Sequence, residues 1–173
     1  ERLAPDDVSL KKTLASLLLS TGDLVGAAER YRALAKRKNL TESDAVPLSQ
    51  LGEGFRQNGN LGSAYEWFRY SLELQPENKL ALTGLFVCGQ LSCDWSSLGE
   101  LEQAVEAVTQ SLLESGKVPI EDPFIHLTRS TSSAENLKVA RAWSEALDVN
   151  GARSNGCNGL DSYGRTALSA ARR

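Results

Sequence analysis

The chain has 173 residues, of which 41% are hydrophobic and 24% charged, and its formal net charge is −3. This composition is typical of a globular protein, and the length allows one domain with a real core or several stacked helix pairs. The slight acidity and the single short basic run, Lys36-Arg37-Lys38, argue against nucleic acid as the main partner. Three cysteines without C-x-x-C spacing and one histidine predict no metal or cofactor site and favour a reducing, cytoplasmic location. No apolar run is long enough for a membrane span, so we expect no membrane partner.

Two segments of the N-terminal half share one pattern of large, small and aromatic residues, and each is divided by a glycine. The dividing residues are Gly22 in TGDL and Gly59 in NGNL, so the segments are offset by 37 residues (59 − 22). The first segment has Leu14-Ala15, Leu18, Ala27 and Tyr31 where the second has Leu51-Gly52, Phe55, Ala64 and Phe68.

This pattern resembles the tetratricopeptide repeat (TPR), a helix pair of about 34 residues. The second segment fits it best, because it also has Leu48 at the first position and a closing proline, Pro76. The extra length between the repeats falls in the polar stretch from Lys38 to Asp44, which lacks apolar periodicity and is predicted to be a longer loop.

A TPR helix pair cannot bury its apolar face alone, so it stacks on its neighbours. We therefore predict an all-α solenoid of helix pairs followed by a few capping or junction helices. Gly52 and Ala64 are expected where two helices approach closely, and Pro76 is expected to end the second helix. The first helix of each pair should line a concave groove.

The repeat pattern continues in part on both sides. Lys79 to Leu91 reads as the first helix of a third repeat, with Cys88 as a core thiol. Upstream, Glu1 to Asp7 matches the residues around Pro76, which predicts the tail of a preceding repeat and a natural protein that extends further. The array is thus expected to occupy residues 1–92, as two full repeats flanked by partial ones.

The pattern stops at Cys93-Asp94-Trp95, and residues 93–150 are predicted to form a helical junction or capping region. Trp95 is expected to be a hydrophobic plug before the next helix, and a disulfide between Cys88 and Cys93 is not expected. A capping box at Ser97 to Glu100 opens a helix that Gly116 ends. Its predicted apolar stripe is Leu98, Leu101, Val105, Val108 and Leu112.

A connector and a short apolar segment, Phe124 to Leu127, lead to a second capping box at Ser132 to Glu135. The helix that this capping box begins is expected to end at Asn150-Gly151. Residues 151–173 are expected to be a linker or poorly ordered tail, in which Tyr163 to Arg173 could form a short helix. The predicted apolar face of that helix is Leu137, Ala140, Trp143, Ala146 and Leu147.

The order of motifs after the repeats resembles a known junction. The motifs are Cys93-Asp94-Trp95, Asp122-Pro123-Phe124-Ile125-His126-Leu127 and Ala140-Arg141-Ala142-Trp143. They are similar to the region that joins TPRs to the catalytic domain in the O-linked N-acetylglucosamine transferase and SPINDLY-like family, especially its bacterial members. The family-specific part covers Leu91 to Leu147.

The resemblance implies two Rossmann-like lobes that bind a nucleotide sugar, but the sequence after Leu147 has no strand, Gly-rich turn and helix in succession. No residue of this chain is therefore assigned the role of a catalytic or nucleotide-binding residue of the family. The family often places Asn before the L-G position of each repeat, whereas Thr13 and Gln50 stand there in this chain.

Three possible sites have plainer explanations. His126 has no acid or thiol partner fixed by sequence, which favours packing or capping over a catalytic base. Asp94-Trp95 favours a turn over a ligand site. The glycines from Gly151 to Gly159 lack the Lys-Ser/Thr of a phosphate-binding loop, which favours a linker. This chain is therefore not expected to be an enzyme.

The predicted functional residues are instead the groove positions on the first helix of each repeat. They are polar and of mixed charge, which suits hydrogen bonds to an extended peptide, although an ordinary solvated face has the same composition. The candidates are Lys12, Ser16, Ser20, Ser49, Glu53, Arg56, Gln57, Thr83, Val87 and Gln90.

The leading functional hypothesis is a TPR module that recruits acceptor protein for an O-linked glycosyltransferase whose catalytic domain is absent from this chain. The alternative is a stand-alone TPR adaptor or assembly scaffold with no link to glycosylation. Self-association of the array is a further possibility, and light scattering would test it.

Overall fold

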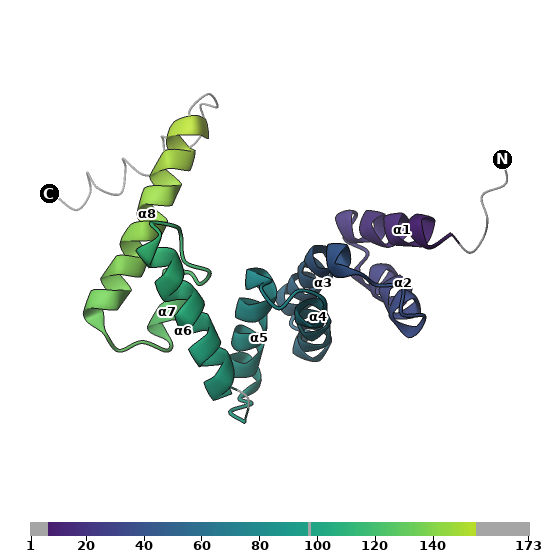
Figure 1. Cartoon of the computed structure of the whole chain (residues 1–173), viewed down its shortest axis with the longest axis horizontal. Coiled ribbons are helices and arrows are strands. Elements are labelled where there is room, and N and C mark those ends of the chain that lie inside the picture. Colours follow the sequence, from purple (N-terminus) through teal and green to yellow (C-terminus); the bar gives the residue numbers. More distant parts are fainter. Residues whose placement is uncertain (1–6, 97, 155–173) are drawn as a thin grey trace, which may run out of the picture. The chain divides into compact units, whose positions relative to one another are not determined.

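In Figure 1 the computed structural model of the chain describes residues 7–96 and 98–154, with side chains up to Leu147. Every regular element in these ranges is helical, and none of their residues forms a strand. None of the described helices is both long and apolar enough to cross a membrane. By their contacts, the residues up to Ser111 form one compact unit and those from Leu112 form another.

The first unit is a succession of helices of similar length, numbered as in Figure 1. They are α1 (Val8–Ser20), α2 (Leu24–Lys36), the 3₁₀ helix η1 (Glu42–Asp44), α3 (Ala45–Gln57), α4 (Leu61–Leu74), α5 (Lys79–Ser92) and α6 (Leu98–Glu114), within which the units divide. Asp7, Asp23, Asn60 and Asn78 cap four of them by accepting hydrogen bonds from backbone amides of the first turn.

The predicted inter-helix glycines lie where the sequence places them. Gly22 ends the turn between α1 and α2 with φ of +84°, and Gly59 does the same between α3 and α4 with φ of +75°. This backbone conformation is costly for residues with a Cβ, which favours glycine at both positions. Pro76 follows directly after the end of α4, as predicted.

The repeat positions form the core of the first unit. Leu48, Leu51, Ala64 and Phe68 are fully buried, and so is Tyr31, which is the equivalent of Phe68 in the first segment. α3 packs against both α4 and α5, and the ring of Phe68 from α4 fits where glycines leave room. A Cβ on Gly52 would lie 2.9 Å from Phe68 Cδ1, and one on Gly84 would lie 2.5 Å from Cε1 and Cε2. The close approach predicted for Gly52 is therefore confirmed, and Ala64 is fully buried.

The polar stretch predicted as a loop from Lys38 to Asp44 includes one turn of 3₁₀ helix, η1. Asp44 is buried there because its carboxylate accepts hydrogen bonds from the Thr41 amide, 2.7 Å away, and from Lys12 Nζ, 2.5 Å away. The stretch therefore ties α1 to the start of α3.

Trp95 is not the hydrophobic plug that the sequence predicts. Cys93 ends α5 in a left-handed conformation, and Asp94 Oδ1 then accepts hydrogen bonds from the amide and hydroxyl of Ser96. This local turn leaves the Trp95 side chain 69% exposed. Cys88 and Cys93 are both free thiols, and Cys88 is buried in the core as expected.

The second unit contains α7 (Pro123–Leu127) and α8 (Ser133–Ser154). The predicted apolar face of α8 is partly wrong, because Leu137 and Leu147 are 50% and 63% exposed, whereas Val139 is fully buried. Leu137 precedes Val139 by two residues, which places it about 200° away around the helix. α8 also runs past the predicted stop at Asn150-Gly151, since a glycine inside a helix costs only about 1 kcal/mol and does not by itself end it. The predictions for Glu1 to Asp6 and for the tail beyond Ser154 fall outside the described residues.

Candidate functional site

A hollow of about 380 Å³ lies on the first unit, between α1 and α3 and beside the starts of α2 and α5. Its apolar wall is formed by Leu19, Leu24, Pro47 and Leu80. Its polar lining is Ser16, Ser20, Gln50, Glu53 and Gln57. The hollow is therefore built mainly from the first helices of successive pairs, on the face where the sequence predicts a groove.

The one carboxylate of the lining is neutralised by its own helix. Glu53 accepts hydrogen bonds from Arg56 Nε at 2.8 Å, from Arg56 Nη2 at 2.6 Å and from Gln57 Nε2 at 2.9 Å. The bond to Arg56 is the main reason that the pKa of Glu53 lies below its ordinary value of 4.5, against the opposing effect of burial. Glu53 is consequently ionised and paired, so the hollow presents no uncompensated charge from this cluster.

The other polar groups of the hollow are neutral. Ser16 Oγ lies 3.1 Å from the Tyr31 hydroxyl, and Ser20 Oγ donates to the Leu17 carbonyl oxygen, which leaves acceptor capacity on both. Gln50 is exposed, and within the described residues its amide has no recorded partner. Gln50 and Gln57 can therefore offer both donors and acceptors to a ligand backbone.

The structure brings together four of the ten predicted groove residues: Ser16, Ser20, Glu53 and Gln57. Ser49 and Thr83 do not belong to a groove, since they are 1% and 8% exposed. Ser49 Oγ donates to the Val46 carbonyl oxygen at 2.8 Å and lies 3.4 Å from Asn78 Nδ2 inside the core.

The remaining candidates lie outside the lining of the hollow. Lys12 is engaged by Asp44 and Arg56 by Glu53, so both serve intramolecular ion pairs. Val87 and Gln90 on α5 are half-buried, and neither lines the hollow. The hollow therefore lies mainly along α1 and α3, whereas the predicted groove continued along α5.

Gln50 is the one residue of the polar lining that the predicted set omits. It stands directly before Leu51-Gly52, and it precedes Glu53, Gly54 and Gln57 by three, four and seven residues, which places all four on one face of α3. Ser49 lies about 100° away, toward the core leucines. Counting in steps of three and four from Gln57 could have found Gln50.

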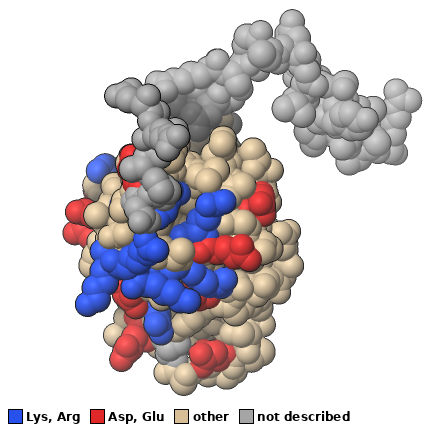
Figure 2. All heavy atoms as spheres, turned by 90° about the vertical axis from the view of Figure 1, so that its right-hand side faces the viewer, with Lys and Arg blue, Asp and Glu red and all other residues tan. Residues whose placement is uncertain are grey.

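The fold also brings together cationic side chains that lie far apart in the sequence. Figure 2 shows lysines and arginines gathered on the side of the molecule where α1 and α2 lie, and Lys11, Arg30 and Arg37 surround a hollow of about 130 Å³ there. Tight nucleic-acid binders neutralise about six to ten phosphates, so three residues make a small patch. Lys11 and Arg37 also have other interactions within the protein.

No three His, Cys, Asp or Glu residues are placed to hold a metal ion within residues 7–96 and 98–154. Compared with known proteins, the chain matches no protein-family model and no curated protein.

Proposed function

We propose that the first unit is a TPR-type scaffold that binds an extended, uncharged peptide in the hollow between α1 and α3. The observation that carries the proposal is the pairing of an aliphatic wall with neutral amides and hydroxyls, in which the only carboxylate is already matched by Arg56. Stacked helix pairs are typical of proteins that bind peptides along a concave face.

The chemistry of the lining sets the kind of peptide. Leu19, Leu24 and Leu80 provide apolar contact for one or two aliphatic side chains of the ligand. The amides of Gln50 and Gln57 would hydrogen-bond the ligand backbone, whose donors and acceptors must be satisfied when water is displaced.

The test is fluorescence anisotropy with a labelled library of short peptides built from Ser, Thr, Gln and aliphatic residues. For a binder from that library, the double variant Gln50→Ala/Gln57→Ala should weaken the affinity by about 30-fold, at about 1 kcal/mol per lost hydrogen bond. Gln103→Ala is the matched control, because Gln103 is exposed on α6, away from the hollow. Equal affinity of the double variant and the wild type would reject the site.

We further propose, on the motifs from Cys93 to Trp143, that this scaffold presents acceptor protein to an O-linked glycosyltransferase domain. The chain incubated with a UDP- or GDP-sugar and acceptor peptides should then give no transfer, and turnover would overturn the module interpretation. Gene sequence downstream of Arg173 that encodes a Rossmann-like domain would support the transferase link. A stop codon there would favour the adaptor instead.

A further inference from the structure

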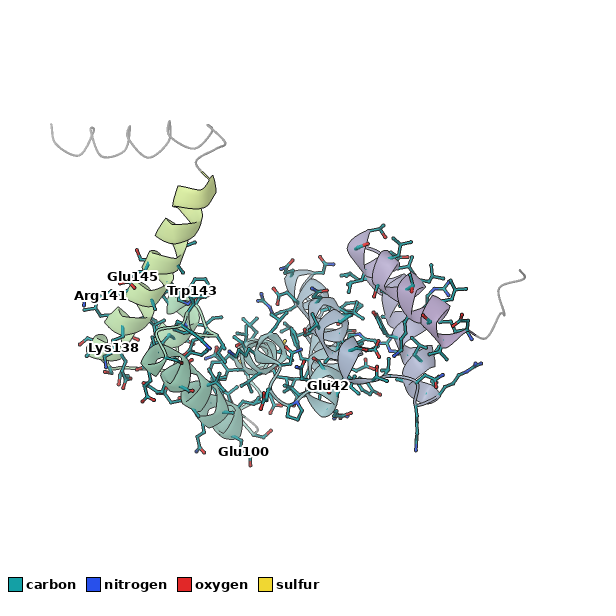
Figure 3. All side chains as sticks on the ribbon, turned by 45° about the horizontal axis from the view of Figure 1, so that its top comes forward. Glu42, Glu100, Lys138, Arg141, Trp143 and Glu145 are labelled. Atoms are coloured by element: carbon teal, nitrogen blue, oxygen red, sulfur yellow. The ribbon has the colours of Figure 1, made fainter. Side chains whose placement is uncertain are left out.

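A second hollow, of about 560 Å³, lies within the second unit between the end of α6 and α8. Leu113, Val118, Ala142 and Ala146 form its apolar surface. Lys117, Lys138, Arg141 and Glu145 are the charged residues of its lining. Figure 3 shows the three labelled charged residues of this set on α8, the helix that also carries Trp143.

The hollow exists because α8 has small residues on this side. Lys138, Arg141, Ala142, Glu145 and Ala146 are spaced by three and four along α8, so they share one face of the helix. Trp143 lies about 200° away from Arg141 and Glu145, on the face that packs inside the unit. The two alanines leave open the space that longer side chains would fill.

The three cations of the lining are not matched by carboxylates of the protein. Within the described residues, Lys117, Lys138 and Arg141 have no recorded ion pair or hydrogen bond through their side chains, and all three are exposed. Glu145 is the only acidic residue of the lining. The site therefore carries an excess of positive charge around an apolar floor, although the whole chain has a net charge of −3.

We propose that this hollow binds an acidic peptide segment that carries an aliphatic side chain between its carboxylates. Val118, which is 38% exposed, and the two alanines would contact the aliphatic group, while the three cations pair with the acidic residues on either side. A nucleotide fits less well, because none of the lining residues is aromatic and a base would have nothing to stack on. The site is separate from the one between α1 and α3.

The experiment measures binding of the full chain to a short fluorescein-labelled peptide in which Glu and Asp alternate with Leu. Lys138→Gln/Arg141→Gln should weaken the affinity by about ten-fold, since one exposed ion pair changes affinity by about two- to five-fold. Arg30→Gln/Lys79→Gln is the matched control, because it removes the same two charges from the first unit and changes the net charge equally, from −3 to −5. Binding should also weaken as salt rises to about 0.3 M.

The apolar half of the site needs its own variant. Ala146→Leu fills the hollow without changing a charge and should weaken binding several-fold, whereas Ala107→Leu at an exposed position of α6 should leave it unchanged. Helical circular dichroism confirms that each variant is folded. Gln50→Ala/Gln57→Ala should also bind the acidic peptide normally, which separates this site from the proposed function.

Three results would overturn the proposal. One is wild-type affinity in the variant that lacks Lys138 and Arg141, and another is wild-type affinity in Ala146→Leu. The third is binding of inorganic phosphate alone, with displacement of the peptide at phosphate concentrations similar to those at which the peptide binds. That result would make this a small-anion site.

Discussion

The indole Nε1 of Trp143 donates a hydrogen bond to the backbone carbonyl oxygen of Glu121, 2.8 Å away and 22 residues earlier in the chain. The carboxylate of the same Glu121 is fully buried, lies 2.8 Å from His126 Nδ1 and accepts a hydrogen bond from Arg129 Nε at 2.8 Å. Glu121 thus joins the connector before α7 to His126 on α7 and Trp143 on α8. His126 is fully buried as well, and the Glu121 carboxylate against its Nδ1 is an acidic partner that the sequence does not indicate.

Replacing Trp143 with Phe keeps most of the ring but removes the hydrogen bond to Glu121. The free energy of unfolding should fall by about 1–3 kcal/mol, because the carbonyl oxygen of Glu121 loses its indole donor in a partly buried place. Urea unfolding followed by circular dichroism measures the change without depending on tryptophan fluorescence.

The matched control is Trp95→Phe, which makes the same chemical change at a side chain that is 69% exposed. Its effect should stay within about 0.5 kcal/mol. If the two variants lose equal stability, the bond between Trp143 and Glu121 does not hold α8 in place.

Gly84→Ala should destabilise the first unit by about 1–3 kcal/mol, because the added methyl group would overlap the ring of Phe68. Thermal unfolding measures the loss. The double variant Gly84→Ala/Phe68→Leu should recover part of it, since the smaller side chain leaves room for the methyl group.

Gly62→Ala tests the same substitution where nothing lies within 4 Å of the new methyl group. Gly62 is the second residue of α4 and has helical backbone, so alanine there reduces the conformational entropy of the unfolded chain, and this variant should be more stable than the wild type by about 0.4–1 kcal/mol. A neutral or stabilising Gly84→Ala would show that Phe68 does not occupy the slot as described.

The sequence predicts the first unit well, because burial there follows helical periodicity. Leu48, Leu51 and Phe68 recur at intervals that place them on the inner faces of their helices, and each is fully buried. Glycines with positive φ at Gly22 and Gly59 mark the turns independently of those intervals. In this unit the helical spacing of the apolar residues agrees with their burial, so the pattern of one repeat is enough to locate the helices.

Prediction from the sequence is poorer where one side-chain hydrogen bond or ion pair determines which residues are buried or paired. Trp95 looks like a core residue by composition, but the turn closed by Asp94 leaves it exposed. Glu121 and Arg129 lie eight residues apart, across α7, so no helical spacing indicates that they pair. Ser49 looks like a surface residue but is 1% exposed, and its hydroxyl tolerates burial because it bonds the Val46 carbonyl oxygen of its own helix.

Cys88 and Cys93 should differ in reactivity toward a thiol reagent. Burial raises the pKa of the Cys88 thiol from 9.0 to about 11, which lowers its thiolate fraction by about a hundred-fold at a given pH, whereas Cys93 is exposed. In a Cys157→Ser variant, one thiol should react quickly with DTNB in the native protein and the second only in denaturant. Fast reaction of both thiols in buffer would contradict the burial of Cys88.

Glu53 should make the first unit sensitive to acid. Its pKa is lowered in the folded chain, chiefly by Arg56, so its stabilising contribution is complete above the ordinary value of 4.5 and is lost as the pH falls through the lowered value. Glu53→Gln should therefore reduce the free energy of unfolding by up to about 1 kcal/mol at neutral pH and should flatten its decline as the pH falls below the ordinary value of 4.5. Glu77→Gln, at an exposed position between α4 and α5, should leave that part of the pH profile unchanged. Urea unfolding across this pH range checks both variants, and parallel curves for Glu53→Gln and the wild type would show that the pair with Arg56 contributes nothing to stability.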